Sequence, residues 1–353
     1  MSLTVLNVAY PLAPVSPDAA GGAEQVLRAL DRALVAAGHR SIVIAAAGSR
    51  VDGALLETEP VLGPFDEAAT RLAQGRTRDA IADALARWPV DLIHLHGIDF
   101  HAYLPPPGPP ALATLHLPPS WYPAEALRPE RADTWLNPVS LSQARDCPPG
   151  ARILRPIPNG VPVAELQAVR HRRRDFALVI GRICPEKGVH LAIDAAEKAG
   201  VALLIAGEVF PYASHQRYFA EEIEPRLGRR CRFLGRVGFR AKRRQHAAAR
   251  CLLVPALAPE TSSLVAREAS ACGTPVIAFP AGAIPEAIEP GVNGFLVEDV
   301  DAMADAIART RSIDAEACRR LARERFCERA MTDAYLDLYG RLSAGSLGLP
   351  GAA

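Results

Sequence analysis

The sequence predicts an α/β fold built from two doubly wound parallel-sheet domains. Short apolar runs alternate with helical patterns, this alternation stops in a stretch rich in Pro and Arg near 156–174, and it then starts again. Strands that alternate with helices form right-handed βαβ units, whose parallel sheet is covered by helices on both faces. A chain of 353 residues also has about the length of two ordinary domains.

Each expected element follows from a short pattern. Apolar runs between turn residues predict strands at 3–9, 41–46, 92–95, 111–115, 135–139 and 153–157, and after the break at 176–180, 202–206, 231–234, 251–254 and 275–279. Apolar residues at helical spacing predict helices at 21–38, around 81–85, at 189–199, around 241–249 and at 263–271, 303–311 and 315–342. We therefore expect domains at 1–165 and 166–330, and a last helix at 331–345 that packs back on the first domain.

Composition excludes several classes of protein. The net charge of +1 argues against a nucleic-acid-binding face, which needs a basic surface. No run approaches the ~20 apolar residues of a membrane span, and the first residues read as a strand rather than a signal peptide. Seven scattered cysteines without a C-x-x-C pair indicate free thiols in a reducing compartment, so we expect a cytoplasmic protein.

A basic motif follows the first strand of the second domain. In GRICPEKG (181–188), Arg182 offers a planar fork of donors and Lys187 a compact charge, just before a helix begins. Ligands of doubly wound sheets bind at strand carboxyl ends, and helix N-termini favour anions. The motif indicates a diphosphate site, although a surface turn with two solvated cations explains it as well. The chain has three lysines, 187, 198 and 242, which makes each of them more noticeable.

Two carboxylates are spaced along the segment 255–279. Glu260 precedes the helix predicted at 263–271, and Glu268 lies inside it among apolar residues. A buried carboxylate needs hydrogen-bond donors, and the two hydroxyls of a ribose would supply them. The alternative is that Glu260 favours the helix dipole and Glu268 pairs with Arg267 or another arginine.

Two weaker signals lie in the first half. Gly21 and Gly22 could let the backbone approach a ligand at a helix start, but a tight turn explains them equally well. His96 and His116 follow neighbouring strands, and each could be structural or line a site. A metal site needs three convergent ligands, and the sequence does not require one.

Together these segments resemble the retaining glycosyltransferases of family 4 (group 1 type), which have the GT-B fold. The resemblance covers almost the whole chain, and its most specific part is GRxxPEKG combined with the two spaced glutamates. The matching pieces are GGAE (21–24), DLIHLHG (91–97), TLH (114–116), IPNGV (157–161), VIGRICPEKG (179–188), LLIAGE (203–208), FLGRV (233–237), PETSSLVAREASACGTPVIA (259–278) and PAGAIPEAIEPGVNGFLVED (280–299).

The resemblance implies roles by position. Arg182 and Lys187 would clamp the donor diphosphate, Glu260 would contact the transferred sugar, and His116 would touch the sugar near the reacting centre. Glu268 would hold the ribose, and Val237 would lie near the base. The remaining positions would meet the donor through the backbone: Gly21, Gly22, Ser262, Ser263 and Leu264.

The resemblance also implies the reaction. The first domain would bind the acceptor and the second the nucleotide sugar, across a cleft between two Rossmann-like domains. A hexose-type sugar would move with retention from a nucleoside-diphosphate sugar, with UDP as the first candidate and GDP as the second. The acceptor would be a small molecule, a glycan or a lipid-linked compound. No cofactor and no metal are implied.

Three alternative functions stay open, and one segment differs from the pattern of the family. The chain could be a non-catalytic nucleotide-sugar-binding homologue, or an epimerase or phosphorylase on the same fold. Many relatives carry Glu-Gly-Phe-Gly-Leu where this chain has Glu260-Thr261-Ser262-Ser263-Leu264, so the wall beside the sugar differs. Basic runs at 170–174 and 229–244 would allow peripheral contact with anionic lipid, or would be solvated faces.

Overall fold

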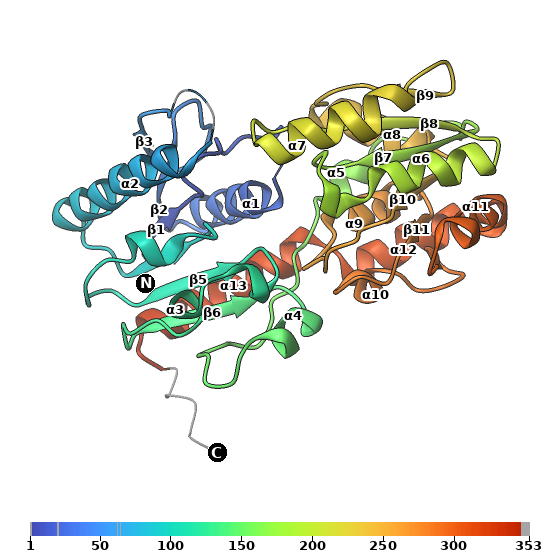
Figure 1. The fold of residues 1–353 in the computed structure, drawn as a ribbon. Coiled ribbons are helices and arrows are strands. Elements are labelled where there is room, and N and C mark those ends of the chain that lie inside the picture. The colour runs from blue at the N-terminus through green and yellow to red at the C-terminus, as the bar shows by residue number, and fades with distance from the viewer. Residues whose placement is uncertain (1, 20, 62, 64, 347–353) are drawn as a thin grey trace. The chain divides into compact units, whose positions relative to one another are not determined.

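The computed structural model describes residues 2–19, 21–61, 63 and 65–346. The chain forms two compact units (Figure 1). The first unit comprises the chain up to Pro158 together with the segment from Ala330 onward, and the second is Asn159–Arg329. Residues 330–346, the last that the structure describes, belong to the first unit.

The first unit contains a parallel sheet of six described strands in the order β3-β2-β1-β4-β5-β6. Its strands are β1 (Thr4–Val8), β2 (Arg40–Ala46), β3 (Ala54–Thr58), β4 (Leu92–Leu95), β5 (Ala111–Leu115) and β6 (Thr134–Pro138). Its helices are α1 (Gly22–Ala36), α2 (Glu67–Arg87), α3 (Ala124–Leu127), α4 (Leu141–Asp146) and α13 (Glu328–Ser343), with short turns η1 (Phe100–Tyr103) and η2 (Pro119–Trp121).

Alternate residues of the first sheet face two different layers. On one face, side chains such as Val5 and Leu92 pack against α1 and α13. On the other, Leu6 and Ile93 pack against α2, η1 and α3. This double coverage is the reason that the strands read as continuous apolar runs in the sequence.

A buried polar network fastens α13 to the first sheet. The hydroxyl of Tyr335 accepts a hydrogen bond from Nδ2 of Asn137 (2.8 Å) and lies 3.1 Å from Oγ1 of Thr114. The hydroxyl of Tyr339 lies 2.7 Å from Nδ1 of His94, whose Nε2 lies 2.7 Å from the same threonine oxygen. These hydroxyls satisfy polar groups that would otherwise be buried without partners.

The second unit repeats the architecture, with the described strands in the order β12-β11-β10-β7-β8-β9. They are β7 (Phe176–Ile180), β8 (Ala202–Ala206), β9 (Cys231–Phe233), β10 (Cys251–Val254), β11 (Val276–Ala278) and β12 (Gly294–Leu296). The helices are α5 (Val163–Gln167), α6 (Val189–Lys198), α7 (Ala213–Tyr218), α8 (Phe239–Ala248), α9 (Leu264–Cys272), α10 (Ile284–Ala287), α11 (Val300–Arg309) and α12 (Ala315–Arg325), with short turns η3 (Pro185–Lys187), η4 (Phe219–Ile223), η5 (Glu224–Arg226) and η6 (Thr310–Ser312).

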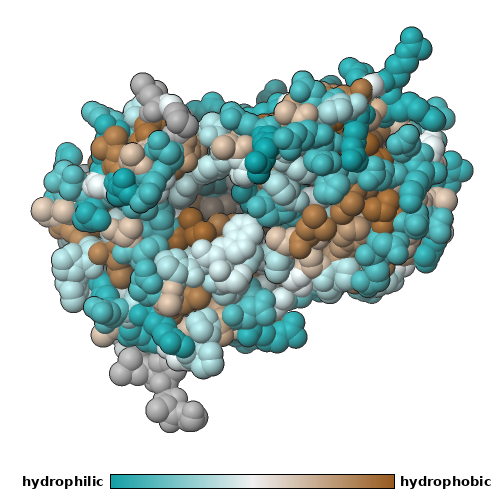
Figure 2. Space-filling model, viewed as in Figure 1, coloured by the Kyte–Doolittle hydropathy of each residue, from teal (hydrophilic) through white to brown (hydrophobic). Residues whose placement is uncertain are grey.

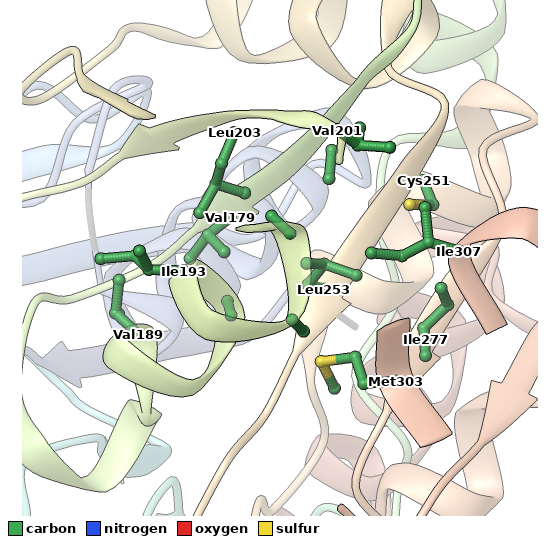
Figure 3. Close-up of a cluster of buried hydrophobic side chains, with 14 of the residues drawn as sticks. Val179, Val189, Ile193, Val201, Leu203, Cys251, Leu253, Ile277, Met303 and Ile307 are labelled. Carbon is green, nitrogen blue, oxygen red and sulfur yellow. The ribbon is translucent and has the colours of Figure 1, made fainter. Parts of the chain in front are cut away.

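The core of the second unit is also two-sided. Figure 3 shows one side, where Val189 and Ile193 of α6 and Met303 of α11 lie against strand residues such as Leu253 and Ile277. The other face of the sheet packs against α5, α8, α9 and α12. Both helix layers are therefore anchored to the same strands, and the loops at the strand ends rest on a fixed base.

Some elements differ from the expectation. The run at 153–157 is not a strand of the sheet: Ile153 forms only an isolated bridge with Leu136, because Pro156 and Pro158 have no N–H group to donate to a ladder. The predicted helix at 315–342 is two helices, α12 and α13. The sequence prediction also missed strands β3 and β12 and the short helices α3, α4, α5, α7 and α10, which follow no strong pattern.

The surface carries few large apolar side chains. On the face in Figure 2, hydrophobic residues lie in small groups among hydrophilic ones. The described helices include none long and apolar enough to cross a membrane. Several arginines of the two basic runs are engaged within the second unit, as when Arg230 donates to the carbonyl of Gly200 and Arg243 to that of Glu165.

We expect Tyr335→Phe to lower the free energy of unfolding by about 1–3 kcal/mol, because it leaves the Asn137 amide and the Thr114 hydroxyl with one partner fewer in a buried site. Urea unfolding followed by circular dichroism measures this change. The matched control is Ser120→Ala, which removes a hydroxyl from an exposed position of η2 in the same unit, and for which we expect less than about 0.5 kcal/mol. Equal effects of the two variants would contradict a stabilising role for the network.

Candidate functional site

Loops at the carboxyl ends of the second sheet are joined by main-chain hydrogen bonds. The N–H of Ile183 donates to the carbonyl of Glu208 (3.0 Å), and the N–H of Leu257 to that of Glu186 (2.9 Å). The loop after β11 joins the same group, since the N–H of Ala283 donates to the carbonyl of Glu260 (2.7 Å). The motif residues that follow β7 and β10 therefore lie on one interconnected edge of the sheet.

Two glycines make this close approach possible. Gly188 has a φ of +60°, and a Cβ there would lie 2.1 Å from the carbonyl oxygen of Pro255. Gly282 has a φ of +61°, and a Cβ there would lie 2.4 Å from the carbonyl oxygen of Glu260. Both positions lie in the left-handed region and against a neighbouring backbone, so a side chain would separate the loops.

Lys187 and Glu260 meet in this edge. The Lys187 ammonium donates a hydrogen bond to Oε1 of Glu260, and both side chains are largely shielded from solvent, at 29% and 12% exposure. The Arg182 guanidinium is half-buried in the same loop and makes no hydrogen bond or ion pair with the part of the chain that the structure describes. Of the two predicted phosphate-binding cations, Lys187 is thus paired with Glu260, and Arg182 is available to a ligand.

Glu268 is paired with a different lysine. Its Oε1 accepts a hydrogen bond from Nζ of Lys242 at 2.5 Å, and Nε2 of His246 lies 3.8 Å from its Oε2. Burial by itself raises the pKa of this carboxyl, but the Lys242 charge and its hydrogen bond, with help from His246, outweigh burial and lower the pKa of Glu268 to about 2. The alternative pairing with Arg267 is wrong, because that guanidinium donates to the Ser262 carbonyl and lies over the Phe326 ring.

The N-terminus of α9 carries two buried hydroxyls. Ser262 and Ser263 are 3% and 4% exposed, and neither Oγ has a hydrogen-bond partner among the described residues. Ser263 also adopts φ +51° and ψ +66°, a left-handed conformation that costs a non-glycine residue roughly 1–3 kcal/mol. Leu264 is the first residue of the helix.

The remaining residues predicted in this unit lie on the neighbouring loop. Val237 follows β9 in a loop whose Gly235 carbonyl accepts a hydrogen bond from the N–H of Gly207 (3.0 Å). Next to it, the Arg236 guanidinium forms an ion pair with Glu208 (3.6 Å). Val237 is therefore beside the same group of loops as Arg182.

The first unit holds the other three predicted residues. Gly21 is the N-cap of α1 with an extended φ of −84°, and Gly22 is the first residue of that helix. His116 follows β5 and is half-buried, with Nε2 3.0 Å from Nδ1 of His96. Desolvation lowers the pKa of His116 to about 3, so both rings are neutral at pH 7 and share one N–H between them.

Sequence reasoning did not place several residues in this site. Lys242 and His246, on α8, reach Glu268 from the preceding helix, and His215, on α7, lies close to the basic motif. The rarity of lysine could have indicated Lys242, because all three lysines of the chain, 187, 198 and 242, form an ion pair with a carboxylate. Nothing in the spacing of the two histidines indicates their contacts.

Glu268→Gln should destabilise the protein at neutral pH by about 3 kcal/mol, since a carboxyl with an ordinary pKa of 4.5 titrates near 2 in the folded state. A lowered pKa gives stability that is present above about pH 4.5 and is lost as the pH falls towards 2. Urea unfolding at several pH values should show the difference between wild type and variant shrinking in that window. The matched control is Glu125→Gln, at an exposed position of α3, which should change the free energy of unfolding at neutral pH by less than about 0.5 kcal/mol.

Ser263→Gly should stabilise the protein by about 1 kcal/mol, because glycine adopts the left-handed conformation without strain. The matched control is Ser262→Gly, which also removes a buried hydroxyl but at a residue without positive φ. The difference in melting temperature between the two variants isolates the backbone effect. A lower melting temperature for Ser263→Gly than for Ser262→Gly would show that strain is not the dominant contribution.

Comparison with known proteins identifies both halves of the chain. Residues 20–146 match the family described as Glycosyltransferase Family 4, and residues 174–312 match Glycosyl transferases group 1. The D-inositol 3-phosphate glycosyltransferase of Mycolicibacterium paratuberculosis is 33% identical over 183 residues, which are 48% of this chain and 40% of that protein. The counterpart from Saccharomonospora viridis is 41% identical over 97 residues, or 25% and 22% of the two chains. The matched part thus spans less than half the length of these curated relatives.

Solved structures share the fold over nearly the whole chain. AviGT4, a glycosyltransferase involved in avilamycin A biosynthesis, superposes with a TM-score of 0.74 at 24% identity, covering 97% of this chain and 98% of that one. Sucrose-phosphate synthase from Thermosynechococcus elongatus gives 0.76 at 22% identity, covering 97% and 100%. Anabaena HepE in complex with UDP and glucose gives 0.72 at 20% identity, covering 96% and 99%. With these two domain matches and two six-stranded parallel sheets, the chain belongs to the family 4, group 1 type of glycosyltransferases, with the GT-B fold.

Proposed function

We propose that the protein transfers a hexose-type sugar from a nucleoside-diphosphate sugar to an acceptor hydroxyl, with retention at the anomeric carbon and without a metal in the transfer step. The observation that carries this proposal is the edge of the second sheet. There, main-chain contacts assemble Arg182, Lys187 and the N-terminus of α9, whose two serine hydroxyls have no hydrogen-bond partner among the residues that the structure describes. Positive groups and free donors at strand ends suit a diphosphate.

The diphosphate would change the contacts of the basic pair. Arg182 is available to bind phosphate oxygens in a bidentate manner, and Lys187 would exchange part of its contact with Glu260 for the diphosphate. Glu260 would then be free to accept hydrogen bonds from the sugar hydroxyls. When the anomeric bond breaks, negative charge grows on the leaving diphosphate, and cations already in place stabilise it without reorganising.

The pairing of Glu268 supports its assignment to the ribose. Lys242 binds Oε1 of the carboxylate, and Oε2 lies 3.8 Å from Nε2 of His246, which leaves Oε2 with acceptor capacity for a hydroxyl. An ionised acceptor in a buried position binds a donor hydroxyl more strongly than a neutral one does. Val237, on the adjacent loop, would contact the base.

His116 would contribute from the first unit as a neutral ring. His96 lies at hydrogen-bond distance from its Nε2, so the orientation of the ring is held from within the first unit. The lowered pKa of His116, to about 3, keeps this ring uncharged at physiological pH, so it would bind hydroxyls rather than phosphate charge. The backbone at Gly21 and Gly22 would meet the donor from the same unit.

The donor nucleotide is proposed from the relatives. A HepE structure contains UDP-glucose, and starch synthase IV of Arabidopsis thaliana was solved with ADP and acarbose. We infer that a UDP-sugar is the first donor to test and a GDP-sugar the second. The acceptor would be a small molecule, a glycan or a lipid-linked compound that presents a hydroxyl group.

A thermal-shift screen with UDP, GDP, ADP and dTDP tests the proposal, because a ligand that binds the native state raises the melting temperature. We expect one nucleotide to raise it in the wild type. Arg182→Ala and Lys187→Ala should abolish most of this shift and lower turnover of the matching nucleotide sugar by roughly 100-fold or more, since each removes a charge that faces the leaving group.

The matched control is Lys198→Ala, which removes one ammonium group from an exposed ion pair with Asp301 on the same unit. It should keep both the shift and the turnover. Unchanged turnover in Arg182→Ala would refute the diphosphate assignment. Nucleotide binding without turnover across an acceptor panel would identify a non-catalytic homologue.

A further inference from the structure

A sulfur, a carboxylate and an imidazole converge beside the basic motif. Cys184 and Glu186 lie in the turn that follows β7, and His215 projects from α7. One ligand atom of each residue lies within 4.8 Å of the other two. Cys184 is fully buried and His215 is 7% exposed, while Glu186 is half-buried and leaves a route from solvent.

The imidazole of His215 has unused bonding capacity. Its Nδ1 is buried and has no hydrogen-bond partner among the described residues. A buried polar atom without a partner is uncommon and calls for a ligand or another explanation.

The set of ligand atoms selects the kind of ion. One thiolate, one imidazole and one carboxylate suit a borderline cation such as zinc, whereas Mg²⁺ and Ca²⁺ require mostly oxygen ligands. A tetrahedral zinc site places its ligand atoms about 3.3–3.6 Å apart, given bond lengths of about 2.0–2.3 Å. Side-chain rotations that move the ligand atoms by about 1 Å would bring the three residues of this cluster to that geometry.

We propose that Cys184, Glu186 and His215 bind one zinc ion, with water as the fourth ligand. On binding, the Cys184 thiol releases its proton to solvent and the sulfur bonds to the metal, while Glu186 and His215 bind through lone pairs. A bound dication displaces the proton of a coordinating thiol outright.

The consequence is a cross-link between two loops. The ion joins the turn that carries Arg182 and Lys187 to α7, two segments that otherwise belong to different βα connections. It would hold the basic motif in place and would take no part in bond breaking. The zinc site goes beyond the proposed function and does not depend on it, because its ligands are residues to which no donor contact has been assigned.

Cobalt titration of the reduced, metal-free full-length protein tests the proposal directly. We expect one Co²⁺ per chain with visible bands typical of tetrahedral coordination and a near-ultraviolet thiolate-to-cobalt charge-transfer band, both removed by added Zn²⁺. Zn²⁺ should also raise the melting temperature. In Cys184→Ser the charge-transfer band should disappear, and in His215→Ala and Glu186→Gln the affinity should fall by roughly 10-fold or more.

The matched control is Cys231→Ser, at a half-buried thiol on β9 outside the cluster, which should leave the spectrum and the affinity unchanged. Circular dichroism confirms that each variant is folded, and the three separate ligand variants keep the test valid if one of them is not. A charge-transfer band that persists in Cys184→Ser, or wild-type protein without such a band, overturns the proposal. The cobalt titration contains no nucleotide, so a negative result would contradict the zinc site without bearing on the proposed transferase activity.

Discussion

The close main-chain approach of the loops at the carboxyl edge of the second sheet is the constraint on which the site depends. Gly188 and Gly282 adopt left-handed conformations against the carbonyls of Pro255 and Glu260, where any side chain would push the loops apart. Because of this contact, Lys187 reaches Glu260, and the Arg182 guanidinium lies in the same connected group of loops. The charges are thus positioned by backbone geometry before a ligand arrives, which is the condition for electrostatic stabilisation at low reorganisation cost.

The charged side chains of the candidate site form lysine–glutamate ion pairs, and a ligand could replace one partner of a pair. Lys187 holds Glu260 at the edge of the site, and Lys242 holds Glu268 inside it, where solvent contributes little screening. Pairing of opposite charges offsets the cost of placing charged side chains where solvent exposure is low. The proposed zinc ligands extend the same principle, since a cation would join a buried thiol to an imidazole whose Nδ1 has no hydrogen-bond partner within the described part of the chain.

Local patterns predicted most of the fold. Strands such as 92–95 and 251–254 have the same bounds in the sequence prediction and in the structure, because a strand covered on both faces is a continuous apolar run. The prediction failed at 153–157, where prolines interrupt an apolar run, and at β3, where the strand is half-exposed and lacks such a run. The positions of the candidate site residues followed from their motifs, whereas their partners did not.

The sequence by itself determined the family, the two parallel sheets and the strand-end loops that carry Arg182, Lys187, Glu260 and Glu268, because these depend on local spacing and on motif chemistry. Only the tertiary structure decided which lysine meets which glutamate, that His96 contacts His116, and that His215 joins Cys184 and Glu186. These contacts join residues that are separated in the chain by as many as 73 positions. Such pairings are set by how helices and loops pack on a common sheet, which no local pattern in the chain encodes.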